Sequence, residues 1–212
     1  MTDKYNIDNL PDILPVFPLE GVLLLPNSRL PLNIFEPRYI NMINDTLASD
    51  SRMIVMTQPK KNGNLVYNIG CAGKIISFEE TLDKRYLITL EGIIRCELKD
   101  ELTEKNGYRR MKIDLEQFSE DLNKQFEDIE RVKFVGVLKK FFKSKKISAD
   151  WNIINNMNDI DLVTNLAMIC PFSNEEKQAL LEAKSLKTRA NLMITMLEIG
   201  SFEENKFNEK RH

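Results

Sequence analysis

The sequence is almost free of histidine: its 212 residues include one, His212, at the last position. Chain ends are rarely ordered, so we expect His212 to belong to no site. With no second histidine the sequence cannot form a Ser-His-Asp or Cys-His catalytic triad within its body, or a histidine-based zinc site. No two cysteines have the C-x-x-C spacing, which also excludes a structural zinc ribbon.

Cysteine is scarce as well. Cys71, Cys96 and Cys170 are odd in number and far apart in the sequence, which favours reduced, buried thiols over a disulfide framework. Cys71 and Cys96 stand among apolar residues, and the sequence offers no evident cation to lower a thiol pKa. We therefore interpret them as small buried side chains rather than nucleophiles.

Long apolar runs and an excess of one charge are also missing. No run approaches the roughly 20 residues that span a bilayer, and the first ten residues lack the apolar core of a secretory signal. The 30 basic and 32 acidic residues leave a net charge of −2, which argues against general affinity for nucleic acid or anionic lipid. We therefore expect a cytoplasmic globular protein without a membrane partner.

A proline-rich stretch from Leu14 to Tyr39 is the most informative part of the chain. Five prolines interrupt its large apolar residues, and each marks an edge, a strand start or a turn because proline cannot donate within a sheet. The runs between them predict short bent strands at 16–19, 22–25 and 30–34. Pro37 then begins a helix of roughly residues 37–48, since proline is tolerated at the first helical position.

The following part of the chain predicts strands joined by short turns. Asn62-Gly63 and Asn106-Gly107 are strong tight-turn signals. Gly70 and Gly73 suggest a bulge or a close backbone approach, and Gly92 a break in register. The predicted strands are 53–57, 67–80, 85–98 and 108–118. Together with the first strands they indicate a curled β pseudo-barrel over residues 13–118, preceded by a flexible tail, 1–12.

From residue 119 the hydrophobic period becomes helical, which predicts a helical bundle over 119–201 and a flexible charged tail over 202–212. The predicted helices are one long helix from Leu122 to about Lys143, a short one at 151–156, one around 162–169 capped by Asp159 or Asp161, and two helices or one kinked helix over 180–197, ending at Gly200. Ser173 and Glu176 fit a capping box. The fold class is therefore α+β.

Three separated blocks carry a resemblance to a known family. LPVFPL, LPLNIFEPRY and PFSNEEKQALLE occur in this order and resemble the amino-terminal substrate-recognition domain of ATP-dependent Lon proteases, or more closely the stand-alone bacterial proteins made of that domain. The resemblance covers roughly Ile13 to Leu197. It implies a PUA-like pseudo-barrel joined to a helical bundle, in a non-catalytic module that binds unfolded or damaged proteins or acts as a proteolysis adaptor.

The resemblance also limits the site. The ATPase and Ser-Lys protease modules of Lon do not fit in this sequence, so we expect no enzyme and no catalytic, cofactor or metal residue. Phe35, Arg38 and Tyr39 match the family's FEPRY run, and we expect them to fix the first helix and to border a peptide groove between barrel and bundle. Leu24 and Leu25 either line this groove or pack in the core.

Two further patterns allow two interpretations each. The segment Lys139–Lys146 is either a basic patch with aromatic residues for RNA or a membrane surface, or the cationic end of a helix. Six methionines either fill the core or form an adaptable binding surface: Met53, Met56, Met157, Met168, Met193 and Met196. Gly70–Lys74 lacks the spacing of a phosphate loop. RNA binding by a PUA-like barrel is the alternative function, and an enzyme acting on a small ligand the third.

Overall fold

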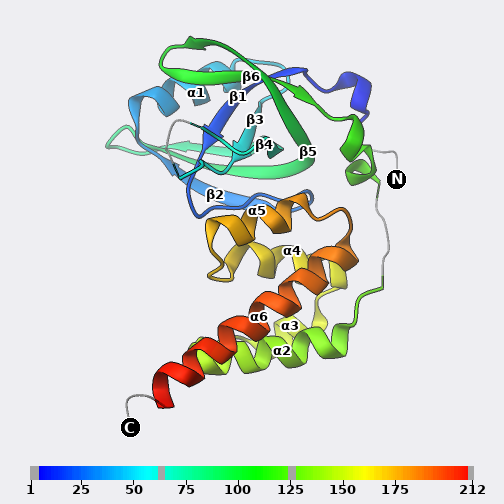
Figure 1. The fold of residues 1–212 in the computed structure, drawn as a ribbon. Coiled ribbons are helices and arrows are strands. Elements are labelled where there is room, and N and C mark those ends of the chain that lie inside the picture. The colour runs from blue at the N-terminus through cyan, green and yellow to red at the C-terminus, as the bar shows by residue number, and fades with distance from the viewer. Residues whose placement is uncertain (1–4, 62–64, 124–127, 210–212) are drawn as a thin grey trace. The chain divides into compact units, whose positions relative to one another are not determined.

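The computed structural model describes residues 5–61, 65–123 and 128–209, and from residue 203 onward it describes the backbone alone. The chain divides into two compact units, residues 1–125 and 126–212. Strands dominate the first unit and helices form the second (Figure 1). The α+β fold predicted from the sequence is therefore confirmed. His212 and the Asn62-Gly63 turn lie outside the described residues.

The described part of the first unit holds six strands in one mixed sheet. They are β1 (Ile13–Pro18), β2 (Arg29–Ile34), β3 (Met53–Thr57), β4 (Ile69–Glu80), β5 (Tyr86–Lys105) and β6 (Tyr108–Asp114). Three helical elements accompany them: η1 (Ile7–Asn9), α1 (Pro37–Leu47) and η2 (Glu116–Leu122). The prediction of a helix that begins at Pro37 is confirmed.

The strands follow the order β2-β5-β4-β3-β1-β6, and β6 also pairs with β5, which closes five of them into a ring. The long strand β5 makes this closure possible because its first half pairs with β4 and its second half with β6. These pairings are antiparallel, as the predicted meander requires, whereas β1 pairs with β3 in parallel. β2 lies outside the ring on β5.

The register between β4 and β5 shifts at Gly73, which pairs with Gly92 across the sheet. Both glycines were predicted to interrupt their strands. Gly92 has no room for a side chain, because a Cβ there would lie 2.1 Å from the carbonyl oxygen of Leu25. The close approach is reinforced by hydrogen bonds from the Asn27 amide to the Gly92 carbonyl and from the Gly92 amide to the Ser28 carbonyl, both 2.9 Å.

The strand predicted at 22–25 was wrong. This segment is an irregular loop, although Leu23, Leu24 and Leu25 are all buried. Side chains replace the missing strand partners: the Ser28 hydroxyl donates to the Leu25 carbonyl at 2.6 Å, and the Gln58 amide donates to the Val22 carbonyl. The run of three leucines therefore correctly indicated a buried segment, but a buried segment does not have to be a strand.

The core of the first unit extends beyond the expected strands. Tyr5, Ile7 and Leu10, within the segment expected to be a tail, are partly buried against it. At the other end Phe118 is buried in the same core, and Leu122 packs against it. The predicted helix from Leu122 to Lys143 was therefore wrong: its start belongs to η2, and the described helix begins only at Arg131.

The second unit consists of helices, with a buried core of large side chains that includes Phe134, Leu138 and Leu162. The helices are α2 (Arg131–Ser144), α3 (Trp151–Asn156), α4 (Asp159–Ile169), α5 (Asn174–Glu182) and α6 (Leu186–Glu209). The short helix at 151–156 and the capping box of Ser173 with Glu176 are confirmed, but the cap of α4 is Asn158. None of the helices in the described ranges is long and apolar enough to cross a membrane.

Gly200 does not end the last helix, as was predicted, because α6 continues to Glu209. A Cβ at Gly200 would lie 2.8 Å from the ring of Phe141 on α2. The glycine therefore allows two helices to approach closely, and this packing role was mistaken for a stop signal. Residues 202–209, which were expected to form a tail, are therefore part of α6.

Candidate functional site

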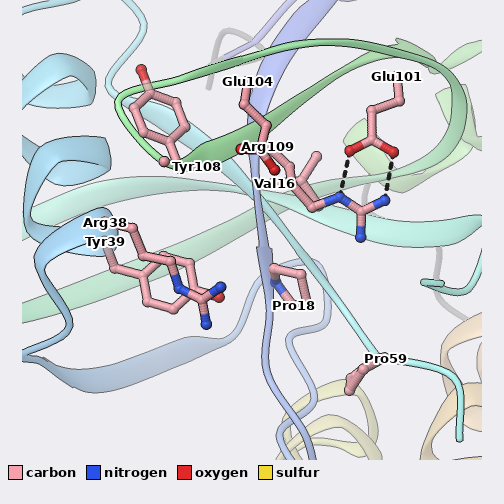
Figure 2. Close-up of a pocket in the computed structure, with 10 residues that line it drawn as sticks. Val16, Pro18, Arg38, Tyr39, Pro59, Glu101, Glu104, Tyr108 and Arg109 are labelled. Carbon is pink, nitrogen blue, oxygen red and sulfur yellow. Dashed lines mark hydrogen bonds and ion pairs between the residues drawn. The ribbon is translucent and has the colours of Figure 1, made fainter. Parts of the chain in front are cut away.

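A groove of about 450 Å³ opens in the first unit where β1 leaves β6 (Figure 2). Val16 is the last residue of β1 that pairs with β6, opposite Arg109. Beyond it Pro18 pairs only with β3, and it has no N–H to offer on either side. The groove thus lies between β1, the start of α1 and the hairpin of β5 and β6, with Pro59 at its rim.

Arg38 and Tyr39, two of the three expected site residues, line this groove from α1. The Arg38 guanidinium lies 4.6 Å above the Tyr39 ring and is 2.8 Å from the carboxylate of Glu36. The centre of the Phe17 ring lies 4.3 Å from the centre of the Tyr39 ring. Tyr39 is consequently only 7% exposed, and burial raises the pKa of its hydroxyl above the usual value. Figure 2 shows both side chains pointing from α1 toward β1.

Phe35, the third expected residue, does not line the groove. It follows the end of β2 and is 63% exposed. The structure therefore brings Arg38 and Tyr39 together and leaves Phe35 on the surface outside, three residues before Arg38.

The turn of the β5–β6 hairpin faces α1. Asn106 and Gly107 both have positive φ, 52° and 84°, as a two-residue type I′ turn requires, so the predicted turn is confirmed. A Cβ at Gly107 would lie 3.4 Å from the Cβ of Arg38. The Asn41 amide donates to the Asn106 carbonyl at 3.1 Å, which holds the turn against the helix.

A second set of contacts fixes the hairpin to α1. The Tyr108 hydroxyl donates to the Asp45 carboxylate at 2.7 Å, and the Lys105 ammonium lies 3.1 Å from the same carboxylate. The hydrogen bond from Tyr108 is the main cause that holds the pKa of Asp45 below its usual range. Both sides of the groove are therefore held in place without a ligand.

The charges in the groove are mostly paired. Arg109 donates two hydrogen bonds of 2.6 Å to Glu101, one to each carboxylate oxygen (Figure 2). These bonds lower the pKa of Glu101 and raise that of Arg109. Glu104 also lines the groove and adds a negative charge near Arg109. Among the residues that the structure describes, its carboxylate forms no ion pair.

The three cysteines are poorly suited to covalent chemistry. Of the thiols considered as nucleophiles, Cys71 and Cys96 are fully buried, and burial raises the pKa of Cys96 to about 12. Burial likewise raises the pKa of Cys170 to about 12. Such thiols stay protonated at neutral pH and are poor nucleophiles.

Most of the other candidate residues of the sequence fill the core. Leu24 and Leu25 are buried, and neither lines this groove. Met53, Met56 and Met193 are buried as well. Phe141 and Phe142 point into the second unit's core at the end of α2, which favours the helix-end interpretation of the basic segment. Gly70–Lys74 lies within β4 rather than before a helix.

The sequence did not indicate that Glu101, Glu104 and Arg109 line the same groove as Arg38 and Tyr39. Their hairpin was predicted from Asn106-Gly107, but its position beside α1 depends on ring closure between strands far apart in the chain. No local sequence pattern predicts such a closure. The charged residues at this end of β5 therefore cannot be distinguished, from the sequence, from the charged residues of any other exposed strand end.

The similarity to known proteins extends over most of the chain. The sequence profile of the ATP-dependent protease La (LON) substrate-binding domain matches residues 13–198. The Lon protease of Endomicrobium trichonymphae is 25% identical over 207 residues, 92% of this chain and 25% of that protein. The Lon protease of Parabacteroides distasonis is 28% identical over 205 residues, 91% of this chain and 24% of that protein. The chain thus spans about a quarter of the length of these relatives.

Two solved structures have a similar fold. The N-terminal domain of the Mycobacterium avium complex Lon protease gives a TM-score of 0.64 at 14% identity, covering 87% of this chain and 97% of that one. A Lon N-terminal domain protein from Xanthomonas campestris gives 0.62 at 18% identity, covering 86% and 97%. At these identities the likeness concerns the fold alone.

Proposed function

The chain belongs to the family of ATP-dependent protease La (LON) substrate-binding domains, and from this we propose that it recognises other proteins by binding their unfolded or damaged segments without cutting them. The family match is the observation that carries the proposal. We place the binding site in the groove of Arg38 and Tyr39, because its sides are fixed by hydrogen bonds and it is open to a segment of chain.

The proposal includes the cellular role. A module that binds unfolded segments suits an adaptor in protein quality control that passes its clients to a protease. Three buried cysteines without a disulfide are consistent with a reducing compartment, and we propose the cytoplasm. We also propose that Phe35, exposed beside the start of α1, extends the binding surface beyond the groove.

A binding assay with a reduced and carboxymethylated protein, which stays unfolded, tests this function against the same protein in its native form. We expect the unfolded form alone to bind. Arg38→Ala should weaken binding by about fivefold or more, a loss of about 1 kcal/mol, which is what truncating one of the few energetically dominant interface residues costs. Phe35→Ala should have a smaller effect.

Arg85→Ala provides a matched control for Arg38→Ala. Arg85 is as exposed as Arg38 and forms the same kind of pair, 2.9 Å from a carboxylate two residues before it, Asp83. Arg85 does not line the groove. If neither protein form binds, the proposed function is wrong; if both arginine variants bind like the parent, the site lies elsewhere.

A further inference from the structure

We propose, on the basis of the function proposed above, that the groove receives a lysine or arginine side chain of the bound segment and that Glu104 pairs with its cationic head. The groove is thus selective for segments that carry a basic residue.

The arginines that line the groove are both occupied. Arg109 donates to Glu101 from Nε and from one terminal nitrogen, both at 2.6 Å, and Arg38 is held 2.8 Å from Glu36. Each pair is neutral as a unit. Because both arginines already have a carboxylate partner, a carboxylate of the bound segment gains less from them than a cation gains from an unpaired carboxylate.

Glu104 is the charged groove residue for which the described residues provide no ion-pair partner. It lines the groove, is exposed, and makes no ion pair within the described ranges of the chain. Its charge is close enough to the already paired Arg109 to help raise the pKa of that guanidinium. Counted with Glu36, which lies outside the groove but pairs with Arg38, the groove carries one net negative charge, and its electrostatic complement is one positive charge.

The aliphatic part of the groove lining suits the rest of a basic side chain. Pro18 and Pro59 are half-buried and contribute aliphatic surface, and lysine and arginine lay their aliphatic stems on such surface while the charged head reaches a polar group. An aromatic side chain or a nucleobase gains less here. One face of the Tyr39 ring is covered by Arg38 and the ring is also packed by Phe17, while Tyr108 is buried.

The test uses fluorescent unstructured peptides that are identical except for one central residue: lysine, glutamine or glutamate. Binding is measured by anisotropy with the full chain. The parent should bind the lysine peptide about two- to fivefold more tightly than the glutamine peptide, the range typical of one solvent-exposed ion pair. Glu104→Gln should abolish this ratio, and Glu104→Lys should reverse it in favour of the glutamate peptide.

Glu79→Gln is the matched control, because Glu79 is an exposed strand carboxylate on β4 that does not line the groove. It should keep the parent's preference. If the parent binds all three peptides equally, or if the preference survives in Glu104→Gln, the role of Glu104 is wrong while peptide binding stands. If no peptide binds, the proposed function and this inference fail together.

Discussion

At the scale of single residues, the buried pair of Arg95 and Asp121 joins η2 to β5. Their side chains are 7% and 11% exposed, and Asp121 accepts two bonds from the guanidinium, 2.7 and 2.8 Å, and one from the Arg95 amide, 3.0 Å. We predict that Asp121→Ala lowers the free energy of unfolding by about 3–5 kcal/mol, because it leaves a buried cation without its carboxylate. Urea unfolding followed by circular dichroism measures the loss.

The control for this prediction is Asp83→Ala. Asp83 pairs with Arg85 at a similar distance, 2.9 Å, but both side chains are more than half exposed. Water screens such a pair, so its loss should cost far less stability than the loss of the buried pair. Equal losses in the two variants would contradict the assignment of Arg95 and Asp121 as an important contact for stability.

At the scale of elements, two glycine substitutions should change stability in opposite directions. Gly107 has a φ of 84° in the hairpin turn, so Gly107→Ala should cost about 1 kcal/mol or more. Gly136 lies inside α2 with nothing within 4 Å of a Cβ placed there, so Gly136→Ala should stabilise by up to about 1 kcal/mol. Urea midpoints at equal slope test both; a gain at Gly107 would show that the turn does not need positive φ.

The elements themselves were predictable where a residue's own chemistry fixes the backbone. Pro37 opened a helix, Asn106-Gly107 made a turn, and Ser173 capped α5. The errors at Leu122 and Gly200 share one physical cause. Both residues are placed by packing against a distant element, the core of the first unit for Leu122 and the Phe141 ring for Gly200, and periodicity along the chain does not report such contacts.

At the scale of the whole molecule, the fold was predictable, whereas the lining of the groove was predictable only in part. The blocks around Leu14–Tyr39 and Ser173 carry the family resemblance, and the family match extends over residues 13–198. Arg38 and Tyr39, which line the groove, could be named from the sequence because they lie in such a block. Glu101 and Glu104 could not, because they reach the groove only through closure of the ring by β5 and β6, about 65 residues further along the chain than Arg38.

The whole molecule's charge separates protein recognition from the RNA-binding alternative. With a net charge of −2, the chain should release few counterions from a nucleic acid. We predict that a short single-stranded RNA fails to bind even at about 50 mM salt, whereas the unfolded protein still binds at about 200 mM salt. Anisotropy titrations of both ligands across this range measure the difference. RNA binding that weakens steeply with salt would instead assign the chain to nucleic acid, since phosphate contacts are the interactions that salt removes in this way.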